Sequence, residues 1–319
     1  MGWVQSHGFL IVSMLINAVV ALSVYVPYMT GQLSLASPGF YAIGGYTAAL
    51  LSTKGVHTVA QVATFEPFGV RLLSFPAGSY PPILVVLEMV LAAAVCILVA
   101  LVIGPPALRL RGIYFALATM AFGELCRVLA LNLGPLGGAV GIFGIPQPFQ
   151  SALWYTQLAL PLLLVAAFIM YRLEKVRAGR AFKAIREDEL AANAVGIRPM
   201  TTKLTAFLVS AVLAGTAGVL AAHLLNTWSA RQVSFELSVV FVSFVVIGGS
   251  RTWLGPIAGA ILLTSLPELL RAASGQQWLP TAASSFLRDG RLMVFGTLIV
   301  LCTIFFPRGL IRPRRLKTP

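Results

Sequence analysis

The chain has 319 residues, of which 58% are hydrophobic and only 10% are charged, against about 25% charged residues in an ordinary soluble domain. Its mean hydropathy of +0.88 excludes a soluble globular enzyme, a disordered chain and a fibrous protein. So much apolar surface does not fit inside one soluble core, so the composition indicates a membrane protein. The formal net charge of +13 is then expected to lie mainly in loops outside the membrane.

Apolar stretches long enough to cross a bilayer recur along the whole sequence. They predict spans at residues 8–29, 33–53, 82–104, 112–132, 151–171, 201–224, 233–250, 253–271 and 291–307. We therefore expect an all-α polytopic membrane protein with about eight to nine transmembrane helices, forming a single transmembrane domain over residues 1–319. A cleaved signal peptide at the first stretch is disfavoured, because residues 1–7 contain no Lys or Arg.

The stretch 33–53 stands apart because it is rich in Gly and Ser and contains Pro38. Either it forms a complete span, or it is broken and partly re-enters the membrane, which is tolerated only where the backbone lies against protein or a cavity. In the later stretch 253–271, Gly255 and Gly259 have the spacing that allows two helices to approach closely.

Charged side chains inside the predicted spans are few. Glu88 lies in the third span without a partner nearby in the sequence, so we expect it to face a cavity or a neighbouring subunit. Glu124 and Arg127 lie in the fourth span, three residues apart, and so share a helix face. We interpret them as a structural ion pair. An ion-coupled carrier usually has a richer set of intramembrane charges.

Basic residues set the orientation of the spans. Residues 172–203 contain eight Lys and Arg residues, and the basic tail 308–319 contains five more. Both segments are expected to be cytoplasmic. Counting spans between them places the loops 54–81 and 132–150, and the N-terminus, on the external side. The Gly-rich part of 132–150 is expected to form an ordered loop.

The sequence offers no sign of other chemistry. The three cysteines and three histidines have no metal-binding or redox spacing, and no aromatic-basic pattern indicates nucleic acid binding. No Gly-Lys dipeptide exists, so no phosphate-binding loop of the Walker A type exists either. We expect a transport subunit that is not an enzyme, that binds no metal and needs no cofactor of its own.

The loop 172–203 is the most informative polar segment. Helix-forming residues fill 181–195, but Glu189 falls on the face shared by Phe182 and Ile185, which predicts two short helices with a break near Asp188. Gly196 is placed to end the second helix, with a proline beyond it. The loop is either a solvated connector or an element that docks into a cytoplasmic partner.

Residues 179–197 resemble the cytoplasmic loop of LivM-type permeases, the membrane subunits of branched-chain amino acid ABC importers. The resemblance rests on Gly179-Arg180-Ala181-Phe182, on Ala184-Ile185-Arg186-Glu187-Asp188-Glu189, and on Ala191-Ala192 followed by Gly196-Ile197. Further segments are similar to signatures of the same family in the same order, namely 31–48, 112–119, 137–146 and 247–268.

The resemblance implies that the loop forms a coupling helix seated in an ATPase. The coupling positions would be Arg180, Ile185, Glu187, Asp188, Glu189 and Gly196. It also implies a second homologous permease subunit, two cytoplasmic ATPase subunits that bind the ATP, and an external substrate-binding protein. The complex would lie in the lipid bilayer of a bacterial or archaeal plasma (inner) membrane, as a multi-pass assembly.

The substrate follows only from the resemblance, which implies leucine, isoleucine and valine. Urea, short amides and aromatic acids are the alternatives within the same permease class, and no residue of the spans identifies a substrate-binding site. A self-contained ion-coupled secondary carrier or channel is the alternative of another class. Dependence on a separate ATPase discriminates between the two. A membrane-embedded enzyme ranks last, for want of a catalytic constellation.

Overall fold

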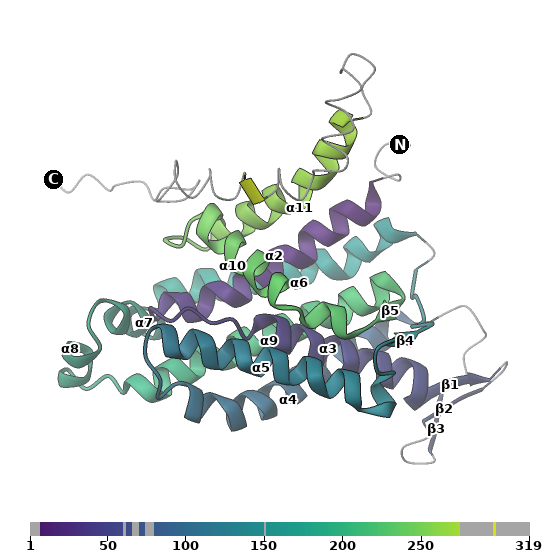
Figure 1. The fold of residues 1–319 in the computed structure, drawn as a ribbon, viewed down its shortest axis with the longest axis horizontal. Coiled ribbons are helices and arrows are strands. Elements are labelled where there is room, and N and C mark those ends of the chain that lie inside the picture. The colour runs from purple at the N-terminus through teal and green to yellow at the C-terminus, as the bar shows by residue number, and fades with distance from the viewer. Residues whose placement is uncertain are drawn as a thin grey trace.

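The computed structural model describes residues 7–59, 62–65, 70–73, 80–149, 151–274 and 296–297. Within them the chain folds as a bundle of roughly parallel and antiparallel helices (Figure 1). Most of the predicted span 291–307, with Cys302, and the predicted tail 308–319 lie outside the described residues.

Five helices are long and apolar enough to cross a membrane. They are α2 (Gly8–Met29), α4 (Pro82–Ala107), α5 (Ile113–Asn132), α6 (Thr156–Lys175) and α9 (Pro199–Leu225). Three further helices, α3 (Ser37–Leu50), α10 (Phe235–Gly248) and α11 (Leu254–Ser274), overlap the other predicted spans of the described part, and α11 extends three residues beyond its predicted end. The prediction of an all-α polytopic membrane protein is confirmed.

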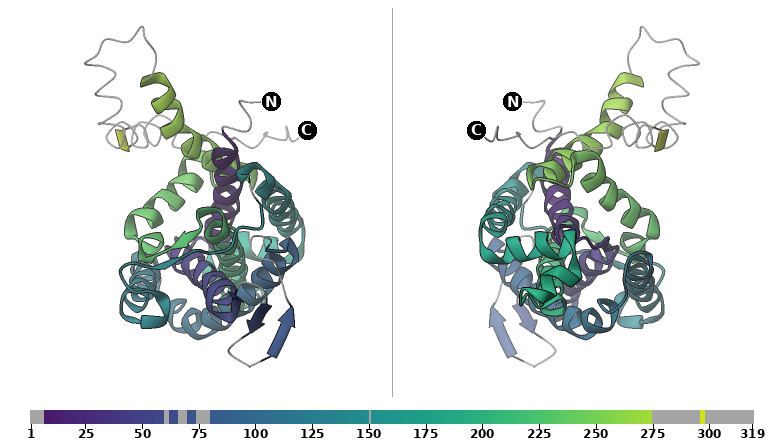
Figure 2. Two further views of the ribbon diagram at one scale, coloured as in Figure 1. Left: turned by 90° about the vertical axis from the view of Figure 1, so that its right-hand side faces the viewer. Right: turned by 90° about the vertical axis from the view of Figure 1, so that its left-hand side faces the viewer.

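Helix α9 lies at the centre of the bundle, and α2, α3 and α4 pack against it. It begins with Pro199 in the first turn, where the missing N–H costs nothing, and it ends at Asn226, whose φ of 57° is left-handed. Most of its side chains, from Ser210 to Leu224, are buried. The end-on views show the other helices arranged around this centre (Figure 2).

Helices α3 and α9 touch backbone to backbone. A Cβ atom added to Gly44 of α3 would lie 2.0 Å from the carbonyl oxygen of Gly215 in α9. Helices α10 and α11 meet in the same way, because a Cβ on Gly259 would lie 2.1 Å from the carbonyl oxygen of Phe244. Small residues at such crossings allow the close van der Waals packing on which membrane helices rely.

The stretch 33–53 does not turn back. Its first residues lie near the start of α5, where the backbone N–H of Leu35 donates to Oγ1 of Thr119 at 3.0 Å. Helix α3 and the π-helical turn Leu51–Gly55 then lead into strand β1 (Val56–Val59) at the other end of the bundle (Figure 1). This course favours the complete span over the re-entrant alternative.

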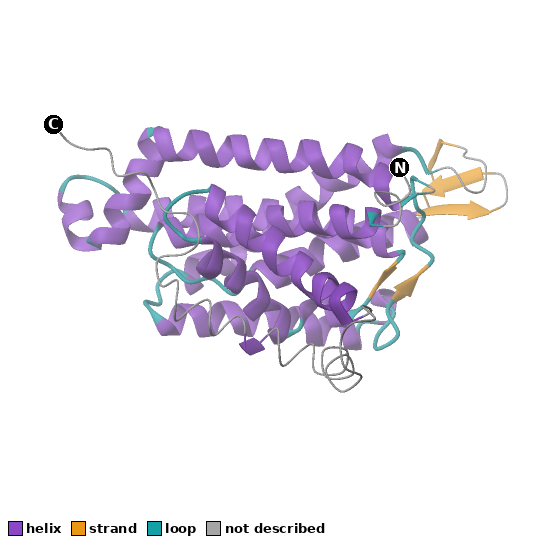
Figure 3. Cartoon of the chain, turned by 90° about the horizontal axis from the view of Figure 1, so that it is seen from above, coloured by secondary structure: helices purple, strands orange, loops and turns teal. Residues whose placement is uncertain are grey.

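Short strands collect at one end of the bundle (Figure 3). Strands β1, β2 (Val62–Phe65) and β3 (Val70–Leu73) form an antiparallel sheet, and β4 (Ile142–Phe143) pairs with β5 (Thr227–Trp228). We call this the strand end. Helices α7 (Arg177–Glu187) and α8 (Glu189–Ala194) lie at the opposite end, which we call the α7–α8 end (Figure 3).

Candidate functional site

The α7–α8 end contains the break predicted from the sequence. Asp188 has an extended backbone, with φ −153° and ψ 114°, and separates the two helices. Its carboxylate accepts hydrogen bonds from the backbone N–H of Leu190 at 2.8 Å and of Ala191 at 3.0 Å, so it caps α8. Gly196, with φ +87°, follows the end of α8, as predicted. Asp188 and Gly196 therefore shape the turn.

Glu189 fastens α8 to the central helix. Its Oε2 lies 2.9 Å from Nζ of Lys203, in the second turn of α9, and the Lys203 side chain is only 7% exposed. Arg111, which precedes α5, lies farther away at 3.9 Å and is mostly exposed. A buried ammonium needs a partner, so the carboxylate of Glu189 is directed at its own chain.

The remaining predicted coupling positions divide by exposure. Ile185 is buried, 4% exposed, and its neighbour on the same face of α7, Phe182, packs into the hydrophobic core of the bundle. Arg180 and Glu187 are exposed, and Arg180 donates to the carbonyl oxygen of Lys175 at 3.1 Å. The structure thus brings all six positions to one end, but only some of them present a side chain outward.

The sequence did not indicate two further candidate contact residues at this end, Leu190 and Val195, which we call the α8 tip. Leu190 is 74% exposed and Val195 is 77% exposed. Both are apolar, and they lie on or directly after α8. Large apolar side chains exposed at the end of a membrane protein that lies outside the spans are candidates for a contact surface. The sequence contains no signal of their exposure, because Leu190 and Val195 flank a run that contains Ala191, Ala192 and Ala194.

At the strand end, the buried charge Glu88 has a partner after all. Its Oε2 lies 2.5 Å from Nε2 of His223 in α9, and its Oε1 accepts a hydrogen bond from the Tyr80 hydroxyl. The expectation that Glu88 faces a cavity or another subunit is therefore wrong. The partner is 135 residues away in the sequence, so the local spacing of charged residues could not predict the contact.

This buried pair also holds the loop between α5 and α6. Nδ1 of His223 lies 2.8 Å from the carbonyl oxygen of Pro146, and the backbone N–H of Ile145 donates to the carbonyl oxygen of Asn226 at 3.3 Å. Both ring nitrogens of His223 thus lie within hydrogen-bond distance of oxygen atoms. The predicted ordered loop is present, and it is tied to the end of α9.

Burial raises the pKa of Tyr80, which precedes α4, and the neighbouring charge of Glu88 raises it further. The phenol therefore stays protonated and donates to the carboxylate. The buried carboxylate of Glu88 thus has two hydrogen-bond partners in place of water, the Tyr80 hydroxyl and the His223 ring. The cluster of Tyr80, Glu88 and His223 therefore holds α4, α9 and the loop between α5 and α6 together.

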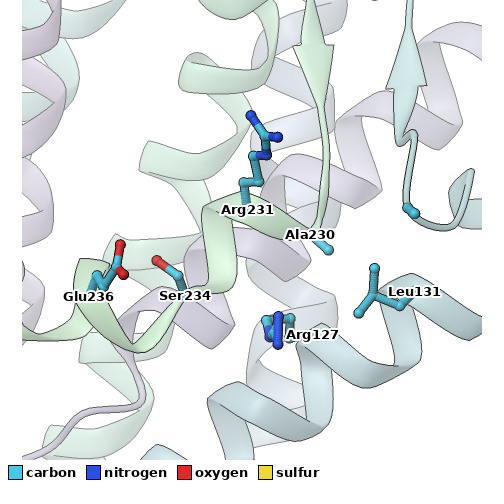
Figure 4. A pocket seen from close by; sticks show the side chains of 7 residues that line it. Arg127, Leu131, Ala230, Arg231, Ser234 and Glu236 are labelled. Atoms are coloured by element: carbon cyan, nitrogen blue, oxygen red, sulfur yellow. The ribbon is translucent and has the colours of Figure 1, made fainter.

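Glu124 and Arg127 form the predicted ion pair, with Nε of Arg127 3.0 Å from Oε2 of Glu124. Beside them lies an open cavity of about 440 Å³ at the strand end. Its polar lining comes from Arg127, Arg231, Ser234 and Glu236 (Figure 4). The apolar part of the lining is Leu131, Ala139 and Ala230.

Comparisons with known proteins agree on one family. The family model described as "Branched-chain amino acid transport system / permease component" matches residues 7–302. The high-affinity branched-chain amino acid transport system permease protein LivM of Escherichia coli (strain K12) is 31% identical, covering 95% of this chain and 67% of the relative. The probable branched-chain amino acid transport permease protein LivM of Methanocaldococcus jannaschii is 24% identical over 88% of this chain and 80% of the relative.

Another relative is named for a different substrate. The autoinducer 2 import system permease protein LsrC of Enterobacter sp. (strain 638) is 25% identical over 64% of this chain and 64% of the relative. No solved structure matches the chain.

Proposed function

Because the chain belongs to the family of permease components of branched-chain amino acid transport systems, we propose that it carries leucine, isoleucine and valine across the membrane as one subunit of an ATP-driven importer. It is a multi-pass permease of the plasma membrane. The names of its LivM relatives support this substrate class.

The proposal includes four partners of three kinds. A second, homologous permease subunit completes the translocation path, two cytoplasmic ATPase subunits bind and hydrolyse ATP, and an external substrate-binding protein delivers the amino acid. The α7–α8 end then faces the cytoplasm, in line with the basic residues of 172–203, and the strand end faces outward.

The observation that carries the proposal is the construction of the α7–α8 end. Leu190 and Val195 extend apolar side chains outward at the tip, while the ion pair between Glu189 and Lys203 fastens the base of α8 to α9. A partner that grips the tip would therefore pull on the central helix. That is what an element coupling ATP hydrolysis to transport has to do.

Movement of α9 reaches the strand end through its packing. Helix α9 contacts α3 backbone to backbone at Gly215, and its far end holds Glu88 and Pro146 through His223. Closure of the ATPases would then rock α7, α8 and α9 as one body and change access to the path from the two sides. The two ends are joined by contiguous contacts in a single helix.

The direct test uses cells from which this chain has been deleted and then restored. Uptake of radiolabelled leucine should disappear on deletion and return with the chain, and it should fail when cellular ATP is depleted. Unlabelled isoleucine and valine should compete, whereas urea and benzoate should not. Competition by urea, short amides or benzoate alone would reassign the substrate within the permease class. Uptake that persists without ATP and stops when the ion gradients collapse would indicate a secondary carrier.

A further inference from the structure

A carboxylate at the end of α6 joins three separate elements. Glu174 lies in the last turn of α6, which ends at Lys175. Its Oε1 accepts a hydrogen bond from the Tyr25 hydroxyl of α2 at 2.8 Å and another from the backbone N–H of Trp253 at 3.2 Å. Trp253 lies in the turn between α10 and α11. One oxygen atom therefore connects α2, α6 and the α10–α11 turn.

These contacts are largely shielded from water. Tyr25 is 2% exposed, and Glu174 and Trp253 are half-buried. The ring of Trp253 also packs edge-on against Tyr171 of α6, with the two ring centroids 6.5 Å apart. Hydrogen bonds to a carboxylate are stronger than those between neutral groups, and they gain further strength where water is excluded. Glu174 and Tyr171 together therefore hold the α10–α11 turn against the end of α6.

The C-terminal part of α2 also holds α7. Val176 has an extended backbone, with ψ 171°, and α7 starts at the next residue, so Glu174 lies just before this break. At the other end of α7, the guanidinium of Arg186 lies over the ring of Tyr28, 5.1 Å from its centroid, in a cation–π contact. The segment from Glu174 to Arg186 is thus attached to α2 at both of its ends, through Tyr25 and Tyr28.

Helix α2 packs in turn against α9 and α11, and α10 and α11 cross closely at Gly259. A pull on α7 therefore has a second route into the bundle, which does not pass through Glu189 and Lys203. We propose that Glu174 is a positioning residue, which makes α2 and the α10–α11 turn follow α7 when the ATPases close. This role rests on the proposed function, since it requires ATPases that hold α7 and α8.

Loss of this carboxylate has a signature that differs from a loss of stability. The exposed side chains of the α8 tip are unchanged, so the ATPases remain attached and continue to hydrolyse ATP. The α10–α11 turn no longer follows α7, so less leucine crosses the membrane for each ATP consumed. A merely destabilised permease would instead lose hydrolysis and transport together, in proportion to the amount of folded complex.

The test measures leucine uptake and ATP hydrolysis in the same liposomes, which contain the permease–ATPase complex. The substrate-binding protein is added on the strand side and ATP on the α7–α8 side. E174A should lower leucine uptake about tenfold, as expected for the loss of hydrogen bonds to a carboxylate. Hydrolysis should stay near the wild-type rate, so the ATP consumed per leucine should rise by the same factor.

Three further variants show whether the hydrogen bonds carry the effect. E174Q keeps a side-chain oxygen that accepts from both Tyr25 and Trp253, so it should restore most of the uptake that E174A loses. Y25F removes only the contact with α2, and its ATP-to-leucine ratio should fall between those of E174A and the wild type. Y114F is the matched control, because it removes the hydroxyl of a tyrosine that is 72% exposed, and it should keep the wild-type ratio.

An unchanged ATP-to-leucine ratio in E174A and Y25F would overturn the role of Glu174, and so would an E174Q variant that behaves like E174A. If E174A does not assemble, Y25F alone decides, because it removes a single hydroxyl. The proposed function fails separately, in the wild type. A wild-type complex that hydrolyses ATP without importing leucine would overturn the importer, whereas leucine import with unchanged ratios in the variants would overturn only the positioning role.

Discussion

At the scale of single residues, two close contacts between polar side chains mark the two ends of α9. Lys203 meets Glu189 near the start of the helix, and His223 meets Glu88 near its end. Each pair joins α9 to a different element. Because a buried charge without its partner is strongly destabilising, each pair should have a measurable effect when one member is removed.

The Glu189–Lys203 pair can be tested by exchanging its charges. E189K would place two ammonium groups within contact distance, so α8 should detach from α9, and ATP-driven leucine uptake should fall about tenfold or more. K203E should do the same. The double variant E189K/K203E restores opposite charges and should recover much of the uptake. Uptake assays on complexes of equal ATPase content provide the measurement, and no recovery in the double variant would argue against the pair.

The Glu88–His223 pair should contribute to stability. H223A leaves the carboxylate of Glu88 buried with the Tyr80 hydroxyl alone, and E88A leaves Nε2 of His223 buried without its partner, so each should cost about 3 kcal/mol. The double variant E88A/H223A removes both polar groups and should cost clearly less than the sum of the two. Thermal unfolding of the purified complex in detergent measures this. Additive effects would show that the two groups do not interact.

What the sequence predicts at this scale depends on separation along the chain. Glu124 and Arg127 share a helix face at three residues apart, so their pairing follows from helix geometry. Glu88 and His223 lie on different helices, and only the packing of α4 on α9 brings them together. Leu190 and Val195 escaped notice for a related reason, since exposure is a property of the fold and not of the residue type.

At the scale of elements, the break between α7 and α8 gives α8 an exposed tip. L190D and V195D change side chains that are already exposed, so the permease itself should keep its stability. Each should nevertheless weaken the attachment of the ATPases, because a carboxylate would enter an apolar contact. Co-purification of the ATPases with the permease measures this effect.

F143D is the matched control for these variants. It replaces another exposed apolar residue, 62% exposed, with the same acid at the strand end. The ATPases should co-purify with F143D as they do with the wild type. If L190D and V195D also retained their ATPases fully, the α8 tip would not be the docking surface.

The crossing of α3 and α9 sets a second test at this scale. G44A places a methyl group 2.0 Å from the carbonyl oxygen of Gly215, so the helices must separate, and the yield of folded complex in the membrane should fall several-fold. G123A is the control, because an added Cβ there meets nothing within 4 Å. Equal yields of the two variants would contradict the close crossing.

Apolar stretches near 20 residues long predicted the helices well, because a membrane requires internal hydrogen bonding along every span. The break at Asp188 and the stop at Gly196 were also readable, since capping and positive φ depend on local residue types. The strands β1–β5 were not predicted. They are too short for a period-two pattern, and β4–β5 join segments that are far apart in the sequence.

At the scale of the whole molecule, the bundle has two dissimilar ends connected by one buried helix. The α7–α8 end presents an apolar tip, and the strand end presents an ordered loop and a charged cavity. A permease driven by ATP needs this separation, with energy entering on one side and substrate on the other. A self-contained carrier would need its own charged relay inside the spans.

The measurement that tests this account most directly is leucine transport by the purified chain reconstituted into liposomes with its permease partner, the two ATPases and the binding protein. We predict that leucine accumulates only when ATP is present on the α7–α8 side and the binding protein on the strand side, and that an imposed proton or sodium gradient does not replace ATP. Accumulation driven by an ion gradient in liposomes that contain this chain alone would contradict the account.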